Sequence, residues 1–179
     1  MRIQIFKPFE DETGTFQSNK LGDIVTASEF NIKNSFYGVG SFKLMISADV
    51  LYADKIKPEY WLLVGGEWVT VDDVVNENGY ISITGKELKG ICTKRVTLYY
   101  NENAPAGTLG YDVIQGTTEQ VMKHYITNNM ISPTDFNRKI FGLENSSTHT
   151  EVAYQNTDTY MSRFENVSEL LEKVGKNKE

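Results

Sequence analysis

Residues 79–86, with the sequence GYISITGK, have the outline of a phosphate-binding loop. Such a loop needs the pattern G-x-x-x-x-G-K-[ST], because its backbone amides curl around phosphate and its last hydroxyl holds magnesium. Here five residues separate Gly79 from Gly85, and Glu87 follows Lys86 where the hydroxyl should stand. A carboxylate there would repel phosphate, and Tyr-Ile-Ser-Ile-Thr is typical of a β-strand. We therefore expect a strand followed by a turn at Gly85, and no nucleotide site.

Other reactive residue types are present without catalytic spacing. His124 and His149 lie far apart and lack the H-E-x-x-H pattern of a metal site, so we expect both to be solvated. Asp72 and Asp73 are neighbours on an expected strand, where side chains alternate between faces; without a bulge they cannot share a metal or a proton. Cys92 has no histidine nearby in sequence and is expected to be buried and inert.

The basic residues form one small cluster and one isolated position. Lys86, Lys89, Lys94 and Arg95 lie close together in an acidic chain, so we expect them to form a solvated face. Arg138 stands between a polar loop and an apolar stretch, where a buried ion pair and an interface contact are both open. The sequence thus predicts no catalytic, cofactor-binding or metal-binding residue, which favours a structural or binding role over an enzyme.

The composition indicates a folded, acidic protein. The chain has 179 residues, of which 40% are hydrophobic and 12% aromatic, enough for a packed core. Its net charge is −6 and its pI about 5.0, which argues against nucleic acid as a partner. The single cysteine excludes an internal disulfide framework and a cysteine zinc site.

We expect no membrane partner. The N-terminus reaches Pro8 and several acids before an apolar export segment could form. The longest apolar runs, such as residues 61–64, are far too short to span a bilayer. These features predict synthesis in a bacterial cytoplasm, and the sequons at Asn145 and Asn166 are read as chance matches.

Alternation of apolar and polar residues predicts short strands through the first hundred residues. Such patterns, or β-branched stretches, occur at residues 3–5, 21–26, 42–46, 61–64, 67–75, 81–84 and 96–100. Gly65-Gly66 predicts a hairpin turn, and Asn78-Gly79 predicts a second turn. This spacing is typical of a barrel or sandwich whose edges are hidden. We expect a β-barrel-like domain over residues 1–112.

Helical signals appear after a long loop at residues 101–110. Thr117 and Gln120 have the spacing of a capping box, and Ser132-Pro133 should stop that helix. Residues 139–141 suggest a returning strand. A last helix, capped by Asn166, carries the apolar stripe Val167, Leu170, Leu171 and Val174, which must be buried on the body or begin a further domain. The fold class is thus α+β, mainly β, with a smaller α/β segment at 113–179 that could be an incomplete second domain.

The order and spacing of these motifs resemble the N-terminal half of siphophage tail hub proteins. This is the tail-associated (prophage endopeptidase or lysin-type) family, similar in fold to the baseplate hubs of contractile phages. The resemblance rests on GVGSFKLMIS (38–47), WLLVGGEWVTVDDV (61–74), ISITGKELKGICTKRVTL (81–98), TTEQVMKHYITNNM (117–130) and NRKIFGLE (137–144). It covers roughly residues 30 to 145, and the terminal helix fits as well.

The resemblance implies a phage or prophage virion protein at the tail tip, without catalysis in this half. Hubs of this kind form a homotrimeric ring that joins the tail tube or the distal tail protein to receptor-binding or wall-degrading parts. It implies neither nucleic acid nor membrane as a partner, and no cofactor.

Two alternatives remain open at this point. One is a small β-barrel binding module for carbohydrate or oligonucleotide, in which Tyr99, Tyr100 and Tyr111 would stack on the ligand. The other is a part of a tail-associated cell-wall hydrolase whose catalytic domain is absent from this chain.

Overall fold

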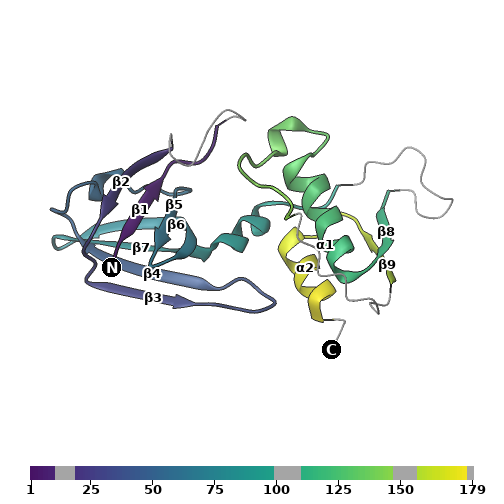
Figure 1. Cartoon of the computed structure of the whole chain (residues 1–179), viewed down its shortest axis with the longest axis horizontal. Coiled ribbons are helices and arrows are strands. Elements are labelled where there is room, and N and C mark those ends of the chain that lie inside the picture. Colours follow the sequence, from purple (N-terminus) through teal and green to yellow (C-terminus); the bar gives the residue numbers. More distant parts are fainter. Residues whose placement is uncertain (11–18, 99–109, 147–156, 177–179) are drawn as a thin grey trace. The chain divides into compact units, whose positions relative to one another are not determined.

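The computed structural model describes residues 1–10, 19–98, 110–146 and 157–176 (Figure 1). The chain divides into two compact units, Met1–Ile91 and Cys92–Glu179. This division lies earlier than the boundary expected at residue 112. The reason is that the backbone after Cys92 bonds within the second unit: the Thr97 amide donates to the Glu165 carbonyl at 2.8 Å, and the Val167 amide donates to the Arg95 carbonyl at 2.9 Å.

The first unit is a seven-stranded sheet in which all neighbouring strands are antiparallel. Its spatial order is β2-β1-β5-β6-β7-β4-β3. The strands are β1 (Ile3–Phe6), β2 (Lys20–Ile24), β3 (Glu29–Lys33), β4 (Ser41–Ser47), β5 (Trp61–Val64), β6 (Glu67–Glu77) and β7 (Tyr80–Glu87), with a short 3₁₀ helix at Ala53–Lys55.

The expected closed barrel is not found in the described part of the chain. Strand β2 pairs with β1 alone and β3 pairs with β4 alone, so these two strands are the edges of an open sheet. A period of two in the sequence shows that one face of a strand is buried. It carries no information on whether the first and last strands of the sheet meet, and this is why closure was wrongly expected.

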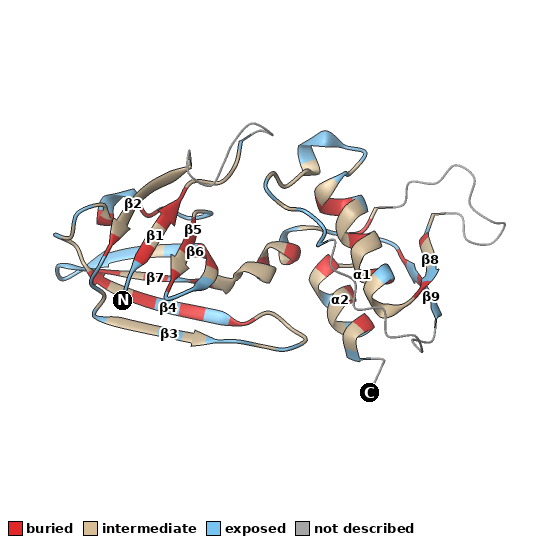
Figure 2. Cartoon of the chain, viewed as in Figure 1, coloured by how far each residue is buried: buried red, intermediate tan, exposed pale blue. Residues whose placement is uncertain are grey.

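The core of this unit lies on one face of the sheet. In β4, Phe42, Leu44 and Ile46 are buried while Ser41 and Lys43 are exposed, as the alternation predicts. The buried set continues across the sheet with Ile3, Ile5, Ile24, Leu62, Val64, Val69, Val71, Ile81 and Ile83. Figure 2 shows these positions as buried segments along the strands. Burial of this one apolar face is the main stabilising term of the unit.

Both expected turns are confirmed. Gly65 and Gly66 connect β5 to β6 with φ values of 61° and 99°, a region that glycine adopts without steric cost. Asn78 and Gly79 connect β6 to β7 with φ values of 51° and 79°. Positive φ at both central residues is the requirement of a type I′ hairpin, for which Asn-Gly is the preferred pair.

The second unit combines a two-stranded ribbon with two helices. Strands β8 (Asp112–Gly116) and β9 (Asp158–Ser162) are antiparallel, and the helices are α1 (Thr118–Ile126) and α2 (Val167–Lys176) (Figure 1). Helix α1 continues into a π-helical turn at Thr127–Ile131, and 3₁₀ helices lie at Leu88–Lys94 and Phe136–Arg138. None of the described helices is long and apolar enough to cross a membrane.

Both helices begin where the sequence predicted. The Gln120 amide donates to the Thr117 hydroxyl at 3.3 Å while the Gln120 side chain accepts from the Thr117 amide at 2.9 Å, which completes the capping box. Helix α2 is capped by Asn166, whose side chain accepts from the Ser168 amide at 3.0 Å. Its stripe is buried against α1 and β9 in a cluster of Val121, Tyr125, Tyr160, Leu170 and Val174. The apolar stripe of the last helix is therefore buried within the second unit.

Two expected strands are absent from the described residues, and three observed strands were not expected. Val96 makes only an isolated bridge to Asn166, residues 97–98 are not in a strand, and Tyr99 and Tyr100 lie outside the described residues. Residues 139–141 form no strand; the Ile140 amide donates to the Met130 carbonyl instead. Strands β3, β8 and β9 were not predicted, because EFNIK, DVIQG and DTYMS are short and largely polar.

Candidate functional site

The second unit buries several polar side chains beside its apolar cluster. Its buried polar side chains are Thr97, Asp112, Asn129 and Ser162, which we call the buried polar cluster. Buried polar groups are stable only when they are hydrogen-bonded. The partners of these four residues therefore decide what the cluster does.

Thr97 and Ser162 fix the turn between β9 and α2. Their hydroxyls lie 2.7 Å apart, and the Ser162 hydroxyl donates to the Glu165 carboxylate at 2.7 Å. The Glu165 amide donates to the Thr97 hydroxyl at 3.1 Å. The Phe164 amide donates to the Thr97 carbonyl at 3.0 Å, and Phe164 itself has a φ of 56°. A bulky side chain at positive φ is strained, so this turn is held by the bonds to Thr97.

Asp112 and His124 join strand β8 to helix α1. The His124 ring nitrogen Nε2 lies 2.6 Å from Asp112 Oδ1, and the Asn128 side-chain nitrogen lies 3.2 Å from the same ring nitrogen. His124 was expected to be solvated, which is wrong, because it packs beside a buried carboxylate with only 26% of its side chain exposed. The error arose because helical spacing placed His124 on a polar flank, while β8, which covers that flank, was not predicted. His149 lies outside the described residues.

One oxygen of this pair is unusual. Asp112 Oδ2 is buried and has no hydrogen-bond partner among the described residues. The neighbouring Tyr125 hydroxyl donates to the Asp112 carbonyl at 3.1 Å. Burial, followed by the negative charges of Asp112 and Glu165, raises the pKa of Tyr125 above its ordinary value. Tyr125 therefore stays protonated and acts as a donor.

Asn129 and Arg138 bind the backbone of residues 96–98, near the start of the second unit. Asn129 donates to the Tyr125 carbonyl at 2.9 Å and accepts from the Leu98 amide at 3.0 Å. Arg138 donates to the Asn129 side chain at 3.4 Å and to the Val96 carbonyl. Burial, and then the charge of Arg95, lower the pKa of Arg138.

The two open readings of Arg138 can now be compared. Within the described chain Arg138 makes no ion pair; it binds carbonyl and amide oxygens. Its own carbonyl accepts from Arg95 Nε at 2.9 Å. The buried ion pair is therefore not formed with a described residue, and the interface contact stays a prediction.

The carboxylates and lysines near β7 are placed by a β-bulge and by ion pairs within the first unit. A register shift between Val71 and Asp73 places Asp72 in a bulge, and both aspartates remain exposed. Lys86 pairs with the exposed Asp72 at 3.4 Å, as expected for a solvated face. Lys89 differs from that expectation, because it pairs at 3.1 Å with Glu87, whose side chain is only 14% exposed, and also donates to the Ser35 carbonyl. An exposed pair such as Lys86–Asp72 contributes little to stability.

The stretch GYISITGK forms strand β7, as predicted, but Gly85 is not in a turn. It pairs with Phe42 and Val71 inside the strand. A Cβ at Gly85 would lie 2.0 Å from the Thr70 carbonyl oxygen. The glycine is needed because the bulge brings the two backbones together there.

Cys92 is buried, as expected, and burial raises its pKa to about 11. A thiol with a raised pKa is a poor nucleophile at neutral pH because the thiolate is the reactive form. Among the described residues, no group of three or more His, Cys, Asp or Glu side chains is arranged to hold a metal ion. Among the described residues, the His124 ring is bonded to Asp112 and Asn128 and packs edge-on against the Tyr125 ring.

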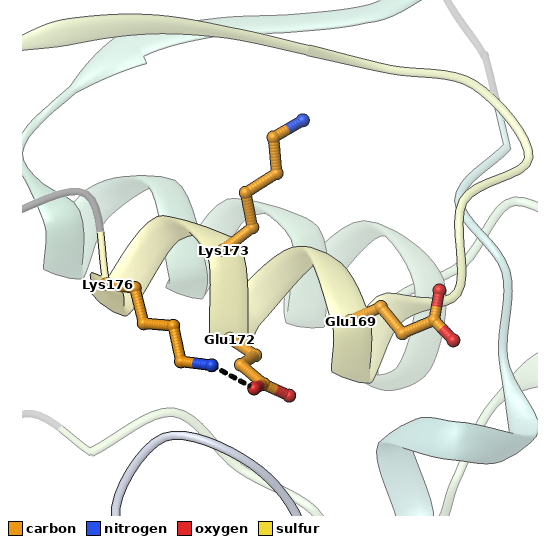
Figure 3. Close-up of a pocket in the computed structure, with 4 residues that line it drawn as sticks. All are labelled: Glu169, Glu172, Lys173 and Lys176. Carbon is orange, nitrogen blue, oxygen red and sulfur yellow. Dashed lines mark hydrogen bonds and ion pairs between the residues drawn. The ribbon is translucent and has the colours of Figure 1, made fainter.

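A shallow pocket lies on the surface of α2. Figure 3 shows that it is lined by Glu169, Glu172, Lys173 and Lys176, with Lys176 paired to Glu172 at 2.5 Å. Ligand sites are mostly apolar with a few convergent polar groups. All four side chains that line it are charged and come from one helix, so they form a solvated helix face.

The buried polar cluster connects segments that are far apart in sequence. Thr97, Asn129 and Ser162 were not singled out from the sequence, because isolated Ser, Thr and Asn residues are common at surfaces. The available signal was the two short polar strands, whose inward positions carry Asp112 and Ser162. Recognising β8 and β9 as strands would have placed both residues on one face.

Comparison with known proteins agrees with a viral origin. No curated protein matches the chain. The family model described as Siphovirus ReqiPepy6 Gp37-like protein matches residues 12–179, which is most of the chain. The chain therefore belongs to the Siphovirus ReqiPepy6 Gp37-like protein family, and the expectation of a phage-related protein is confirmed at that level.

Proposed function

We propose that this chain is a non-catalytic structural component of a phage or prophage tail tip, the hub that links the tail tube to the distal tip. The observation that carries the proposal is the siphovirus family match over residues 12–179. In this role the chain is a homotrimer whose neighbours are the tail tube and the distal tail protein. It is made in the bacterial cytoplasm and retained in the virion.

The chemistry of the described residues supports a structural role. The hydroxyls of Thr97 and Ser162 are bonded to each other and to the turn before α2. The Cys92 thiol is buried and has a raised pKa. The Thr97 and Ser162 hydroxyls thus hold the turn before α2, and the Cys92 thiol is part of the interior.

The proposal is tested with purified particles of the phage or induced prophage that encodes the chain. Mass spectrometry should find the chain at a constant ratio to the tail tube protein through a density gradient and after a high-salt wash. Absence from washed particles would contradict a virion role. The purified chain should also leave peptidoglycan intact; release of soluble fragments that exceeds a heat-denatured control would favour the hydrolase alternative.

A further inference from the structure

The ribbon of β8 and β9 has one buried face and one exposed face. Asp112 and Ser162 are opposite each other on the buried face, as are Ile114 and Tyr160. Because side chains alternate along a strand, Val113 and its partner Met161 point the other way. Met161 is 52% exposed, and Figure 2 shows exposed positions along β9.

The exposed face extends one pair beyond the regular ribbon. Tyr111 precedes β8 and Arg163 follows β9, so the alternation places both on the same side as Met161. The Arg163 guanidinium lies 5.9 Å from the centre of the Tyr111 ring and 5.3 Å from the centre of the Phe164 ring. We call Tyr111, Val113, Met161, Arg163 and Phe164 the ribbon face.

Two properties of the ribbon face indicate a protein interface. Phe164 is 62% exposed although its backbone is held at a strained, positive φ. The bonds of this turn to Thr97 therefore hold a largely exposed apolar ring in a strained conformation. The face also combines aromatic residues, Met and Arg without any acid or lysine, which is the composition of interface cores.

The charge of the ribbon face defines its partner. Arg163 is exposed and makes no ion pair with a described carboxylate; its contacts are the two aromatic rings. Guanidinium groups bind carboxylates through paired, charge-assisted hydrogen bonds. The matching surface should therefore be apolar with an unpaired carboxylate.

The outer face of the β6–β7 hairpin has these features. Along β6, Asp73, Val75 and Glu77 share one face, and Glu77 is opposite Tyr80. Val75 is 40% and Tyr80 47% exposed. Asp73 and Glu77 make no ion pair with a described residue, in contrast to Asp72, which binds Lys86. We call Asp73, Val75, Glu77 and Tyr80 the hairpin face.

We propose that the ribbon face of one copy of this chain binds the hairpin face of a second copy. Arg163 pairs with Asp73 or Glu77, and Phe164 packs on Val75. The complementarity is local, between the exposed Arg163 and the carboxylates of the hairpin face, because both units are acidic overall: Met1–Ile91 carries 13 acidic and 9 basic residues and Cys92–Glu179 carries 11 acidic and 9 basic residues. The inference rests on the proposed homotrimer and names the surfaces that form it.

The two faces differ, so the contact is head-to-tail. A head-to-tail contact places each copy on the next one and closes into a ring when the rotation allows. Each face has only a few exposed anchor residues, so the contact belongs to the small, transient class of interfaces, below roughly 1,200 Å². We expect a dissociation constant in about the micromolar to millimolar range.

Sedimentation velocity of the full chain over a wide concentration range tests the proposal. The variants are Arg163→Glu, the double variant Asp73→Lys with Glu77→Lys, and the combination of all three. Lys57→Glu is the matched control, since Lys57 is exposed and belongs to neither face. Circular dichroism and thermal melts show whether each variant folds as the wild type does.

We expect the wild-type mass to rise with concentration toward that of a trimer. Arg163→Glu and the double variant should each weaken association by at least about tenfold, the triple variant should recover most of the loss, and Lys57→Glu should change nothing. A wild-type oligomer that is insensitive to Arg163→Glu overturns the proposed surfaces but not the homotrimer. A wild-type monomer at every concentration overturns the self-contact, whereas the presence of the chain in washed particles tests the virion role independently.

Discussion

Replacement of Leu170 by alanine should show how firmly α2 is held in the second unit. Leu170 is 2% exposed and lies in the cluster formed with Val121 and Tyr125. Leu→Ala substitutions in cores cost about 2–5 kcal/mol, because the lost transfer free energy is increased by a residual cavity. Because the Leu170 side chain is almost completely buried, we expect Leu170→Ala to lower the free energy of unfolding by about 3 kcal/mol.

The adjacent Leu171 provides the matched control. It is on the same helix but only partly buried, and Leu→Ala changes helix propensity equally at both positions. We expect Leu171→Ala to cost about 1 kcal/mol, since only part of its surface leaves water.

Urea unfolding followed by far-UV circular dichroism measures both variants, and a thermal melt checks the ranking. For a unit of this size, about 3 kcal/mol corresponds to a Tm lower by roughly 12–24 °C. Equal losses at Leu170 and Leu171, or a loss below about 1 kcal/mol at Leu170, would refute the packing of α2 on α1.

Three further changes test local features. Thr117→Ala should destabilise the second unit by about 1 kcal/mol in urea because the capping box is lost, while Thr117→Ser should be nearly neutral. Gly85→Ala should cost at least about 2 kcal/mol, because its Cβ would meet the Thr70 carbonyl; a neutral result would contradict the close approach of the strands. The raised pKa of Cys92 means that the unfolded chain loses the thiol proton first, so stability is full below the unfolded pKa and falls between pH 9 and about 11. Urea unfolding at stepped pH should show a steeper fall for the wild type than for Cys92→Ala, and equal slopes would contradict the burial.

Local patterns predicted the local structure well. The hairpin turn at Gly65-Gly66 and the cap at Thr117 were found because the residues that form them are neighbours in sequence. The strands with a buried apolar face, such as β4 and β7, were found because a period of two reports burial directly.

Long-range features could not be read in the same way. The bulge at Asp72 and the role of Gly85 depend on how β6 meets β7, and no local signal reports that pairing. The Thr97–Ser162 bond joins residues 65 positions apart whose types are common at surfaces. Sheet closure also depends on the two edge strands, which are distant from the residues that show the alternation.

Immunogold labelling of intact particles tests the central claim most directly. An antibody against the purified chain, viewed by electron microscopy, should place gold at the distal end of the tail, and this label should disappear when the antibody is preincubated with the chain. A tail-tip hub would be contradicted by gold that is spread along the tail tube or confined to the head. It would also be contradicted if intact particles carry no gold although denaturing gels of the disrupted particles show that they contain the chain.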